Sequence, residues 1–560
     1  MEKLTLPKML EESCRKYSNN IAMSYVDGDP LTYSELCKRT SQLSQFLMKK
    51  GIQKGDKVAI LSENQPNWGI SYFAITSIGA VAVPIMTEFH ESQVHHVLRH
   101  SESKAIFISK KLYSKIENAE LEDLTIRVMI DDLSYIQPES NVEKVKEFIL
   151  EGKGEINKIK EAAMKFVGAA GTEVAEDDLA LIIYTSGTTG HSKGVMLTHK
   201  NVIANSISVL GFANVHEEDR MLSILPLFHT IESTLGLVVP LSRGASVYYV
   251  DKPPTAGVLL PAMKKVKPTV MVSVPLIIEK IYKLKVIPEI KKSALLRNLY
   301  KVPSLRKKIN KKAGHKLSLT FGGHLRMFCI GGAALAPDCE LFLREAGFPY
   351  AIGYGLTETS PLSSGTDNLE TRLTSAGKAI PGVEIKIDNP DPQTGEGEVL
   401  IKGPHVMKGY YKDPETTGEV FTKDGWFKSG DLGVLDKDGY LYIKGRSKNV
   451  IVGSNGKNIY PEEVEAIINS YDFVAESLVF ENNGKLFAKV HLDYDLVDKA
   501  FSIKNLNDSE ARKKINELLD QLHSFVNGKV STFSRVAKMV EQEEPFEKTP
   551  TKKIKRFLYG

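Results

Sequence analysis

Cysteine is scarce in this sequence, and long hydrophobic runs are absent. Only four cysteines occur in 560 residues, and their spacing matches neither a metal-binding motif nor the dense pairing of small secreted domains. No run of about 18 apolar residues is present, so we expect no transmembrane helix. The first residues also lack the apolar segment of a signal peptide. These absences argue against a disulfide framework and favour the reducing cytoplasm as the location. The cysteines are Cys14, Cys37, Cys329 and Cys339.

Acidic residues are nearly missing from one segment, residues 280–316. This segment carries 13 Lys and Arg residues against a single acid, Glu289, for a charge of +12, although the net charge of the whole chain is only +4. The remainder of the chain is therefore at −8. Such a run is typical of a solvated helical face. It also suits a surface for anionic lipid at the inner face of a membrane, or for an acidic carrier protein. No nucleic-acid-binding motif accompanies it, so nucleic acid is not expected as a partner.

The length and composition predict an α/β protein of several domains. A chain of 560 residues is too long for one simple core and suggests two to four domains or subdomains. Helical and strand signals alternate through about the first 440 residues, which indicates layered α/β architecture. The oligomeric state is left open, a homodimer included. Strands are expected at 57–61, 105–108, 179–184, 246–250 and 326–330, with a helix and a connector over 141–174.

The sequence pattern changes after about residue 371. Short β segments separated by Gly and Asp turns follow, at 382–387 and 397–401, and predict a small β subdomain over about 371–445. A final domain, residues 446–560, opens its first helix with Pro461 and two acids, which suit the first turn of a helix. We therefore expect a large N-terminal domain of residues 1–445 and a smaller C-terminal domain.

The most informative stretch is residues 184–195, which reads Tyr-Thr-Ser-Gly-Thr-Thr-Gly-His-Ser-Lys-Gly-Val. It follows an apolar run, residues 179–183, which predicts a buried strand. Glycines allow a tight turn and a close approach of the backbone to a ligand. Hydroxyls, backbone N–H groups and a lysine are groups that bind a polyphosphate. We therefore predict a phosphate-binding loop. Its candidate ligands are Thr185, Ser186, Gly187, Thr188, Thr189, Gly190 and Lys193.

This loop departs from the Walker motif at two positions. Ser192 stands where the second glycine should be, and Gly194 stands where the Mg²⁺-binding hydroxyl should be. Both differences argue against a P-loop kinase or ATPase. The order Ser-Gly-Thr-Thr-Gly-x-x-Lys-Gly instead resembles the signature of adenylate-forming enzymes, which include acyl-CoA synthetases, luciferases and peptide-synthetase adenylation domains. The resemblance implies ATP as a substrate and Mg²⁺ as a cofactor, with Thr185 at the metal and at the reacting phosphate.

A second cluster, Tyr354-Gly355-Leu356-Thr357-Glu358, joins an aromatic ring, a hydroxyl and a carboxylate. By itself, a loop with a capping threonine explains it equally well. It also matches the Tyr-Gly-x-Thr-Glu signature of the adenylate-forming family. The resemblance implies that Tyr354 stacks on adenine, that Thr357 binds the α-phosphate and that Glu358 holds Mg²⁺. Gly355 belongs to the same nucleotide-binding segment.

Two further motifs lie beyond residue 425. Asp431 in Ser-Gly-Asp would ordinarily be interpreted as a turn residue. The family resemblance implies instead that Asp431 accepts hydrogen bonds from the two ribose hydroxyls. Arg446 in Gly-Arg-Ser-Lys matches a guanidinium that bridges ribose and phosphate. Lys448 falls at the hinge position of the family.

The acyl site is suggested by three segments. Pro226-Leu227-Phe228-His229 resembles a family motif whose histidine borders the acyl group, although His229 is also explained as a core histidine. Peptide-synthetase domains carry Asp at this position, so an amino-acid substrate is not expected. Gly331, Gly332 and Ala333 resemble the wall of the adenine and acyl pocket. Residues 228–232 and 274–282 are similar to long-chain fatty acyl-CoA synthetases.

The C-terminal tail supplies the last candidate. By composition, residues 546–556 are merely a basic tail. The family ends with Thr-x-x-Gly-Lys-Ile-x-Arg, in which the lysine is catalytic, and aligning Ile554 and Arg556 places that lysine at Lys553. Lys552 stands where the family has glycine, so Lys552 and Lys555 remain alternatives.

Together these matches identify the chain as a member of the AMP-forming acyl-CoA synthetases, closest to the bacterial long-chain fatty acyl-CoA synthetases. The resemblance implies formation of acyl-AMP from ATP and a fatty acid, with release of pyrophosphate, followed by transfer to the thiol of coenzyme A. It implies a mobile α+β C-terminal domain that presents Lys553 in the first step, and Gly456 and Lys457 to coenzyme A in the second. An acyl-carrier-protein synthetase and a non-catalytic nucleotide- or acyl-binding relative remain alternatives. The catalytic set is Lys553, Glu358, Thr185 and His229.

Overall fold

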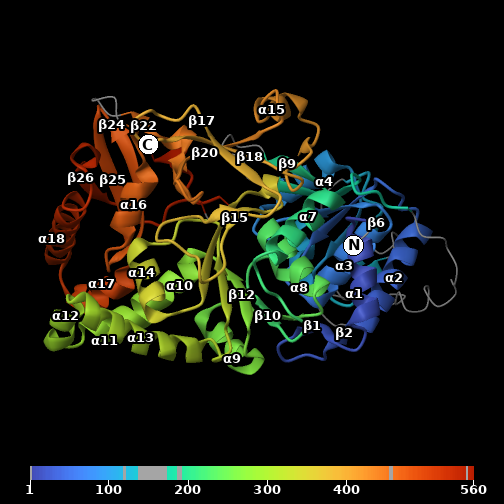
Figure 1. Ribbon diagram of the computed structural model, residues 1–560, viewed down its shortest axis with the longest axis horizontal. Helices are drawn as coiled ribbons and strands as arrows, with labels where there is room; N and C mark the ends of the chain where they lie inside the picture. The colour runs from blue at the N-terminus through green and yellow to red at the C-terminus, as the bar shows by residue number, and fades with distance from the viewer. Residues whose placement is uncertain are drawn as a thin grey trace.

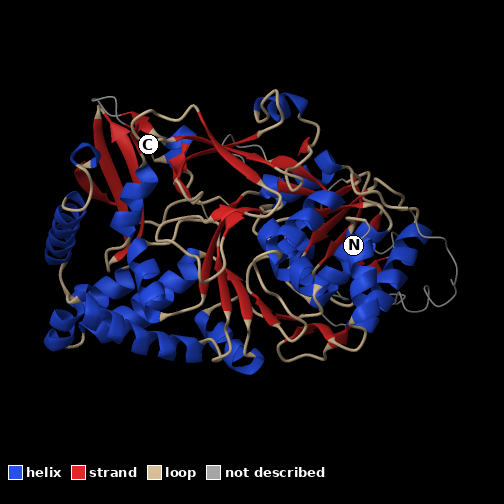
Figure 2. Cartoon of the chain, viewed as in Figure 1, coloured by secondary structure: helices blue, strands red, loops and turns tan. Residues whose placement is uncertain are grey.

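The computed structural model describes residues 3–117, 121–136, 173–185, 192–452, 458–549 and 553–559. Two large mixed sheets, of nine and eight strands, are layered with helices (Figures 1 and 2). A four-stranded sheet and a three-stranded sheet follow toward the C-terminus. The α/β layers expected from the sequence are therefore confirmed. The connector predicted over 141–174 lies outside the described residues, apart from residues 173 and 174.

The eight-stranded sheet has three parallel strands at its centre, β3 (Lys57–Leu61), β4 (Val81–Pro84) and β5 (Ser103–Ile108). Nearly all their residues are buried, as expected for parallel strands covered on both faces. α3 (Pro66–Ser77) joins β3 to β4 and is apolar on almost every side, because it is buried between layers. The outer strands are β6 (Ile126–Met129) and β7 (Ser134–Ile136) at one edge, and β8 (Leu179–Thr185), β9 (Lys193–Thr198) and β19 (Gly409–Tyr410) at the other.

The nine-stranded sheet holds four parallel neighbours, β10 (Arg220–Ser223), β12 (Val270–Ser273), β13 (Met327–Ile330) and β14 (Tyr350–Gly355). α7 (His199–Leu210) and the π-helix η2 (Ile231–Val238) pack together, and η2 also packs against β10 and β12. The remaining strands are β15 (Leu362–Gly365) and β16 (Lys378–Ala379) beyond β14, and β11 (Ser246–Tyr249), β1 (Ile21–Tyr25) and β2 (Leu31–Thr32) beyond β10.

The last third of the chain forms two smaller units. β17 (Glu384–Asp388), β18 (Gly397–Lys402), β20 (Phe427–Leu435) and β21 (Leu441–Arg446) make an antiparallel four-stranded sheet. Beyond it, β24 (Val474–Asn482), β25 (Lys485–Leu492) and β26 (Val536–Glu541) are covered by α16 (Pro461–Asn469) and α18 (Asp508–Asn527), with a hydrophobic cluster of their own. The division at 445/446 and the hinge at Lys448 stay predictions.

The basic segment forms short helices along one edge of the molecule (Figure 1). They are α10 (Pro275–Ile281), the π-helix η3 (Tyr282–Val286), α11 (Ile287–Lys291), α12 (Ala294–Tyr300) and α13 (Pro303–Thr320). α13 buries Asn310, Gly314 and Leu317 and turns its lysines to solvent. Among the described residues, no helix combines the length and the apolar character that spanning a bilayer requires.

The expectation for the cysteines is corrected at one pair. Cys14 on α1 (Leu6–Lys16) and Cys37 on α2 (Tyr33–Lys49) form a disulfide, with their Cα atoms 6.3 Å apart. α1 and α2 pack together, which brings side chains 23 residues apart into contact. Sequence spacing could not show this, because the pairing depends on helix packing.

Candidate active site

The predicted phosphate loop connects two paired strands. Thr185 ends β8 and Lys193 begins β9, and the two residues are partners across the antiparallel ladder. The loop therefore starts and ends at one point of the sheet edge. Ser186, Gly187, Thr188, Thr189 and Gly190 lie outside the described residues.

Glu358 lies beside this hairpin. It is on the short helix η4 (Thr357–Thr359), which packs against β9. The hydroxyl of Tyr410 donates a hydrogen bond to Glu358 Oε1 at 3.0 Å, and the ammonium of Lys193 lies 5.2 Å from the centre of the Tyr410 ring. Tyr410 thus links the predicted phosphate lysine to the predicted metal carboxylate. Sequence reasoning missed Tyr410, because nothing in its local pattern marks it.

Asp431 is the centre of a buried polar cluster. Its carboxylate is only 6% exposed and pairs with Arg446 Nε at 2.8 Å. The hydroxyl of Tyr354 donates to the other carboxylate oxygen at 2.6 Å. Burial raises the pKa of Asp431, while Arg446 and Tyr354 oppose that shift. The structure therefore brings together the three residues expected to hold adenine and ribose.

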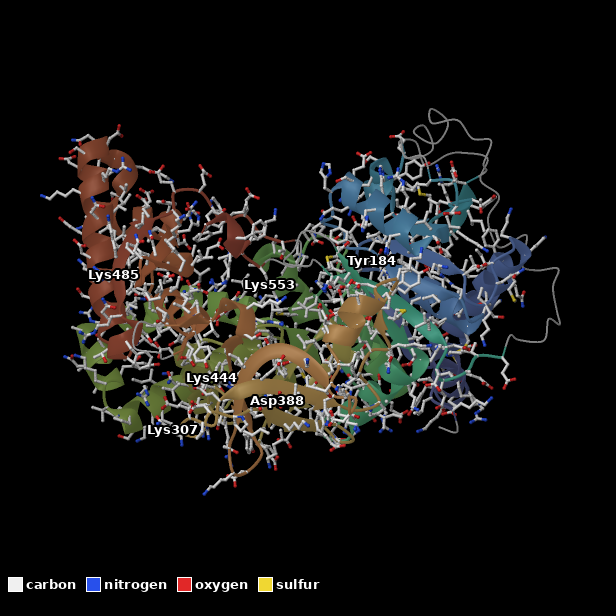
Figure 3. The ribbon with its side chains drawn as sticks, turned by 90° about the horizontal axis from the view of Figure 1, so that it is seen from above. Tyr184, Lys307, Asp388, Lys444, Lys485 and Lys553 are labelled. Carbon is white, nitrogen blue, oxygen red and sulfur yellow. A yellow bond between two sulfur atoms is a disulfide. The ribbon has the colours of Figure 1, made fainter. Side chains whose placement is uncertain are left out.

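Lys553 reaches the same place from the C-terminal tail. Arg556 anchors this tail by donating to Glu465 Oε2 at 2.5 Å and to the carbonyl of Val479 at 3.3 Å. Lys553 retains solvent access yet is surrounded by protein atoms, so desolvation lowers its pKa, as does the charge of Arg446. The carboxylates of Asp431 and Glu358 are close enough to oppose that shift. Figure 3 shows Lys553 between the C-terminal units and the half of the chain that carries Tyr184.

The other tail lysines differ in position. The ammonium of Lys555 pairs with Glu547 at 3.2 Å, away from the cluster. Lys552 lies outside the described residues, as do Gly456 and Lys457. The geometry therefore favours Lys553 over Lys555 for chemistry at the cluster.

His229 lies on the approach to η2. Its ring packs on Phe228 at 4.4 Å, and its carbonyl accepts the N–H of Glu232 and Ser233 at the start of the helix. Burial lowers its pKa to about 4, and the charge of Lys553 adds to that shift. His229 is therefore neutral at pH 7 and lies close to Lys553.

A cavity opens beside these groups and runs over the nine-stranded sheet. It starts at Gly331, Gly332 and Gly355, and about 70 Å³ of it is open to the centre of a water-sized sphere. Gly332 adopts a φ of +86°, a conformation that favours glycine at this turn. Ala333, the third predicted wall residue, follows on the same exposed turn. Apart from Thr366 and Cys329, the described side chains that line the cavity are hydrocarbon or thioether. The lining includes Val209, Phe212, Ala213, Val215, Met221, Ile231, Leu235, Val239, Val270, Val272, Met327, Ile330, Ala351, Ile352, Pro361 and Leu362.

Glu232, on the back of η2, is a fully buried carboxyl that sequence reasoning did not single out. Ser223 donates to its Oε1 at 2.5 Å, while its Oε2 has no partner among the described residues. Asn64 donates to Ser223 and to the carbonyl of Leu225, and accepts the N–H of Leu227. Burial raises the pKa of Glu232 to about 8. This network holds the loop that leads to His229.

The cluster suits a nucleotide with its metal. A carboxylate beside vicinal hydroxyls and an aromatic ring beside a base are common means of holding a nucleoside. Mg²⁺ usually takes one or two protein oxygen ligands and completes its shell with waters and substrate phosphates. Glu358 and Thr185 fit that requirement, although the described residues hold no group of three or more potential metal ligands.

Known proteins resemble this chain in sequence and in fold. The profile of the family described as AMP-binding enzyme matches residues 10–411. The chain is 29% identical to a long-chain-fatty-acid–CoA ligase of Mycobacterium bovis, over 95% of this chain and 91% of that protein. It is 28% identical to a chloroplastic long-chain-fatty-acid–acyl-carrier-protein ligase of Arabidopsis thaliana, over 82% and 72%. The fold matches the o-succinylbenzoate–CoA synthetase of Bacillus subtilis in complex with AMP, with a TM-score of 0.72, 25% identity, and coverage of 98% of this chain and 97% of that one.

Glu232 gives a prediction for stability. A folded-state pKa near 8, above the usual 4.5, means that the native state keeps a proton that the unfolded state loses between those values. The favourable contribution of the protonated carboxyl is complete below the unfolded pKa and is lost as the pH rises through the folded pKa. We therefore expect the free energy of unfolding of Glu232→Gln, relative to that of the wild type, to increase as the pH rises, by at most about 1.4 kcal/mol per pH unit.

The measurement is the thermal midpoint of both proteins at about pH 6 and about pH 9. Glu217→Gln, which alters an exposed carboxyl, serves as the control and should show no pH-dependent difference. Parallel pH curves for the wild type and Glu232→Gln would show that Glu232 does not hold a proton in the folded state.

Proposed function

Because the chain belongs to the family of AMP-binding enzymes, we propose that it activates a long-chain fatty acid with ATP and transfers the acyl group to coenzyme A. The observation that carries this proposal is the apolar cavity that starts beside the cluster of Lys553, Glu358 and Asp431. The long-chain-fatty-acid–CoA ligase among its relatives supports the same substrate class.

In the first step, a carboxylate oxygen of the acid attacks the α-phosphorus of ATP and pyrophosphate leaves. Asp431 and Arg446 would hold the ribose, and Tyr354 the adenine. Lys553 and Lys193 would offset the negative charge that builds up on the phosphates. Mg²⁺ on Glu358 and Thr185 would polarise the phosphoryl oxygens. Thr357 and the glycine-rich loop would bind the remaining phosphate oxygens.

The cavity length favours a long hydrocarbon chain. Phe328 on β13 pairs with Tyr350 on β14, so Met327 lies level with residue 349. Gly355 lies six positions farther along β14. Six positions cover about 20 Å at about 3.3 Å per residue. An extended polypeptide has three backbone bonds per residue and spans at most about 3.3–3.6 Å per residue, which is roughly 1.1–1.2 Å per bond. We take the same advance per bond for an extended acyl chain. The lining of the cavity is therefore about as long as an extended chain of 17 bonds.

In the second step, the thiol of coenzyme A attacks the acyl carbon and AMP leaves. We propose that the C-terminal domain, residues 446–560, then turns about Lys448, which lies exposed just after β21. This motion would withdraw Lys553 and bring Gly456 and Lys457 to the acceptor. The two steps of the proposed reaction thus need two different positions of the C-terminal domain.

Two alternatives share the same site. An acyl-carrier protein could replace coenzyme A, and the ligase from Arabidopsis thaliana supports that reading. A non-catalytic relative is less consistent with the site, because Lys193, Glu358, Asp431, Arg446 and Lys553 are all present in it.

We also propose that the exposed face of α13 contacts an anionic membrane. Five lysines lie on this face, and none forms an ion pair within the part of the chain that the structure describes. Leu295 is 67% exposed and Leu319 is 56% exposed, which adds apolar side chains near the charge. Figure 3 shows Lys307 on the outer edge of the molecule. The lysines are Lys307, Lys308, Lys311, Lys312 and Lys316.

The first prediction from the proposed function concerns its chemistry. ATP–pyrophosphate exchange should depend on the acid, rise from acetate to palmitate, and yield acyl-CoA when coenzyme A is added. Lys553→Ala should lower exchange by roughly a hundredfold or more, because it removes a charge at the reacting phosphate. The matched control is Lys555→Ala, whose ammonium faces Glu547 and which should retain exchange.

The same assay separates the alternatives. Exchange without acyl-CoA would assign the acceptor role to a carrier protein. Absence of exchange with every acid would contradict the proposed enzyme activity.

The second prediction concerns the hinge. Lys448→Pro should leave exchange within about threefold of the wild type and lower acyl-CoA formation by about tenfold or more, because proline restricts the backbone that must rotate. Lys448→Ala removes only the side chain and should preserve both steps. An equal loss of both steps in Lys448→Pro would contradict a hinge at this residue.

The third prediction concerns the membrane. Reversing the charge of Lys307 and Lys311 to Glu should abolish sedimentation with vesicles that contain an anionic phospholipid, while acyl-CoA formation from dissolved acid persists. Reversal of the exposed Lys423 and Lys437, which lie in the turns before and after β20, is the control. Unchanged sedimentation of the α13 variant would contradict the proposed membrane surface. If the variant instead loses only its activity with an acyl-carrier protein as the acceptor, the lysine face of α13 binds that protein.

A further inference from the structure

The cavity ends at a row of three side chains. Met221 is the partner of Val270, and Val270 is the partner of Met327, so the three residues lie at one level across β10, β12 and β13. All three line the cavity. This row marks the end farthest from Gly331 and Gly355.

The residues just before this row form an ion pair. Arg326 precedes Met327, and its guanidinium donates two hydrogen bonds to the carboxylate of Asp219, one of them from Nε at 2.9 Å. Thr269, which precedes Val270, donates to the same carboxylate at 2.7 Å. The pair therefore crosses the ends of all three strands at the far end of the cavity.

One side of this pair is buried and the other reaches solvent. The carboxylate of Asp219 is 6% exposed, whereas the side chain of Arg326 is 34% exposed. Burial opposes ionisation of Asp219, but the bonds from Arg326, Thr269 and the N–H of His216 outweigh it and lower its pKa. The pair thus lies between the buried beginnings of these strands and the solvent.

Apolar side chains are exposed beside Arg326. Asn368 donates to the carbonyl of Arg326 at 3.2 Å, and the next residue, Leu369, is 86% exposed. Leu319 lies within contact distance of Gly323, three residues before Arg326.

We infer that the Asp219–Arg326 ion pair closes the far end of the cavity and sets the longest acyl chain that the enzyme accepts. This inference rests on the proposed function, since it assigns the cavity to the acyl chain. A longer acid must separate a largely buried ion pair before its last carbons fit, and each additional methylene gains little in return. The pair thus acts as a specificity determinant without contact with the reacting atoms.

The test is the chain-length profile of a double variant, Asp219→Ala/Arg326→Ala. Removal of both partners leaves no unpaired buried charge and opens the end of the cavity. The ratio of kcat/KM for behenate to that for palmitate should rise by about tenfold or more. The palmitate value should stay near that of the wild type, since palmitate ends short of the pair. A second variant, Asp219→Leu/Arg326→Leu, refills the site with apolar side chains that a longer chain can displace without separating charges, so it should raise the ratio less than the alanine pair does.

The matched control removes another Arg–carboxylate pair. Arg306 and Glu345 form a part-buried pair between α13 and α14 (Pro337–Ala346). Like Asp219 and Arg326 they are not lining residues, but neither is next in sequence to a residue that lines the cavity. Arg306→Ala/Glu345→Ala should leave the ratio unchanged. An unchanged ratio in both variants at the Asp219–Arg326 pair, with palmitate activity retained, would overturn the inference.

One more variant distinguishes failure of the inference from failure of the proposed function. Val215→Phe fills the far end of the cavity and should lower activity with palmitate more than with laurate. If Val215→Phe shifts the profile but the double variants do not, the cavity holds the acyl chain and the ion pair does not limit it. If Val215→Phe also leaves the chain-length profile unchanged, the cavity does not hold the acyl chain. The proposed fatty-acid site and the proposed role of the ion pair are then both wrong.

Discussion

The site depends on one buried carboxylate, that of Asp431. Tyr354 comes from the nine-stranded sheet and Arg446 from the last residue of β21, yet both bind this carboxylate. A buried charge is costly unless it is paired and hydrogen-bonded, so Asp431 constrains how these two sheets meet. Lys553 lies within the influence of the same charge. In this arrangement, the central sheets and the C-terminal tail therefore meet around the position proposed for the ribose.

The architecture separates charge from hydrocarbon. The polar groups gather where the parallel strands of the nine-stranded sheet end, which is where α/β sheets commonly bind ligands. The cavity runs back from that edge along the same strands toward their beginnings. One end of a fatty acid needs cations and hydrogen-bond donors, and the rest needs only apolar packing. The sheet thus supplies both environments along a single direction. The Asp219–Arg326 ion pair places charged groups at the opposite edge of the sheet.

Much of the fold follows from local patterns. Apolar runs predicted β3, β8 and β13 because a strand buried on both faces leaves little room for polar residues. Motif order located Lys553 and Asp431, which the structure places together. The remaining features depend on distant partners. Tyr410 meets Glu358 across 52 residues, Arg326 meets Asp219 across 107, and Cys14 pairs with Cys37 across 23. Such contacts arise from packing, and no local periodicity reports them.

The most direct test of the central claim is photo-crosslinking with a fatty acid that carries a diazirine at its terminal carbon, in the presence of ATP. The labelled residues are then identified by mass spectrometry. Crosslinks are expected at Val215, Met221, Val270 or Met327, which line the cavity. Crosslinks confined to other surfaces, with none among these four residues, would contradict the assignment of the cavity to the acyl chain.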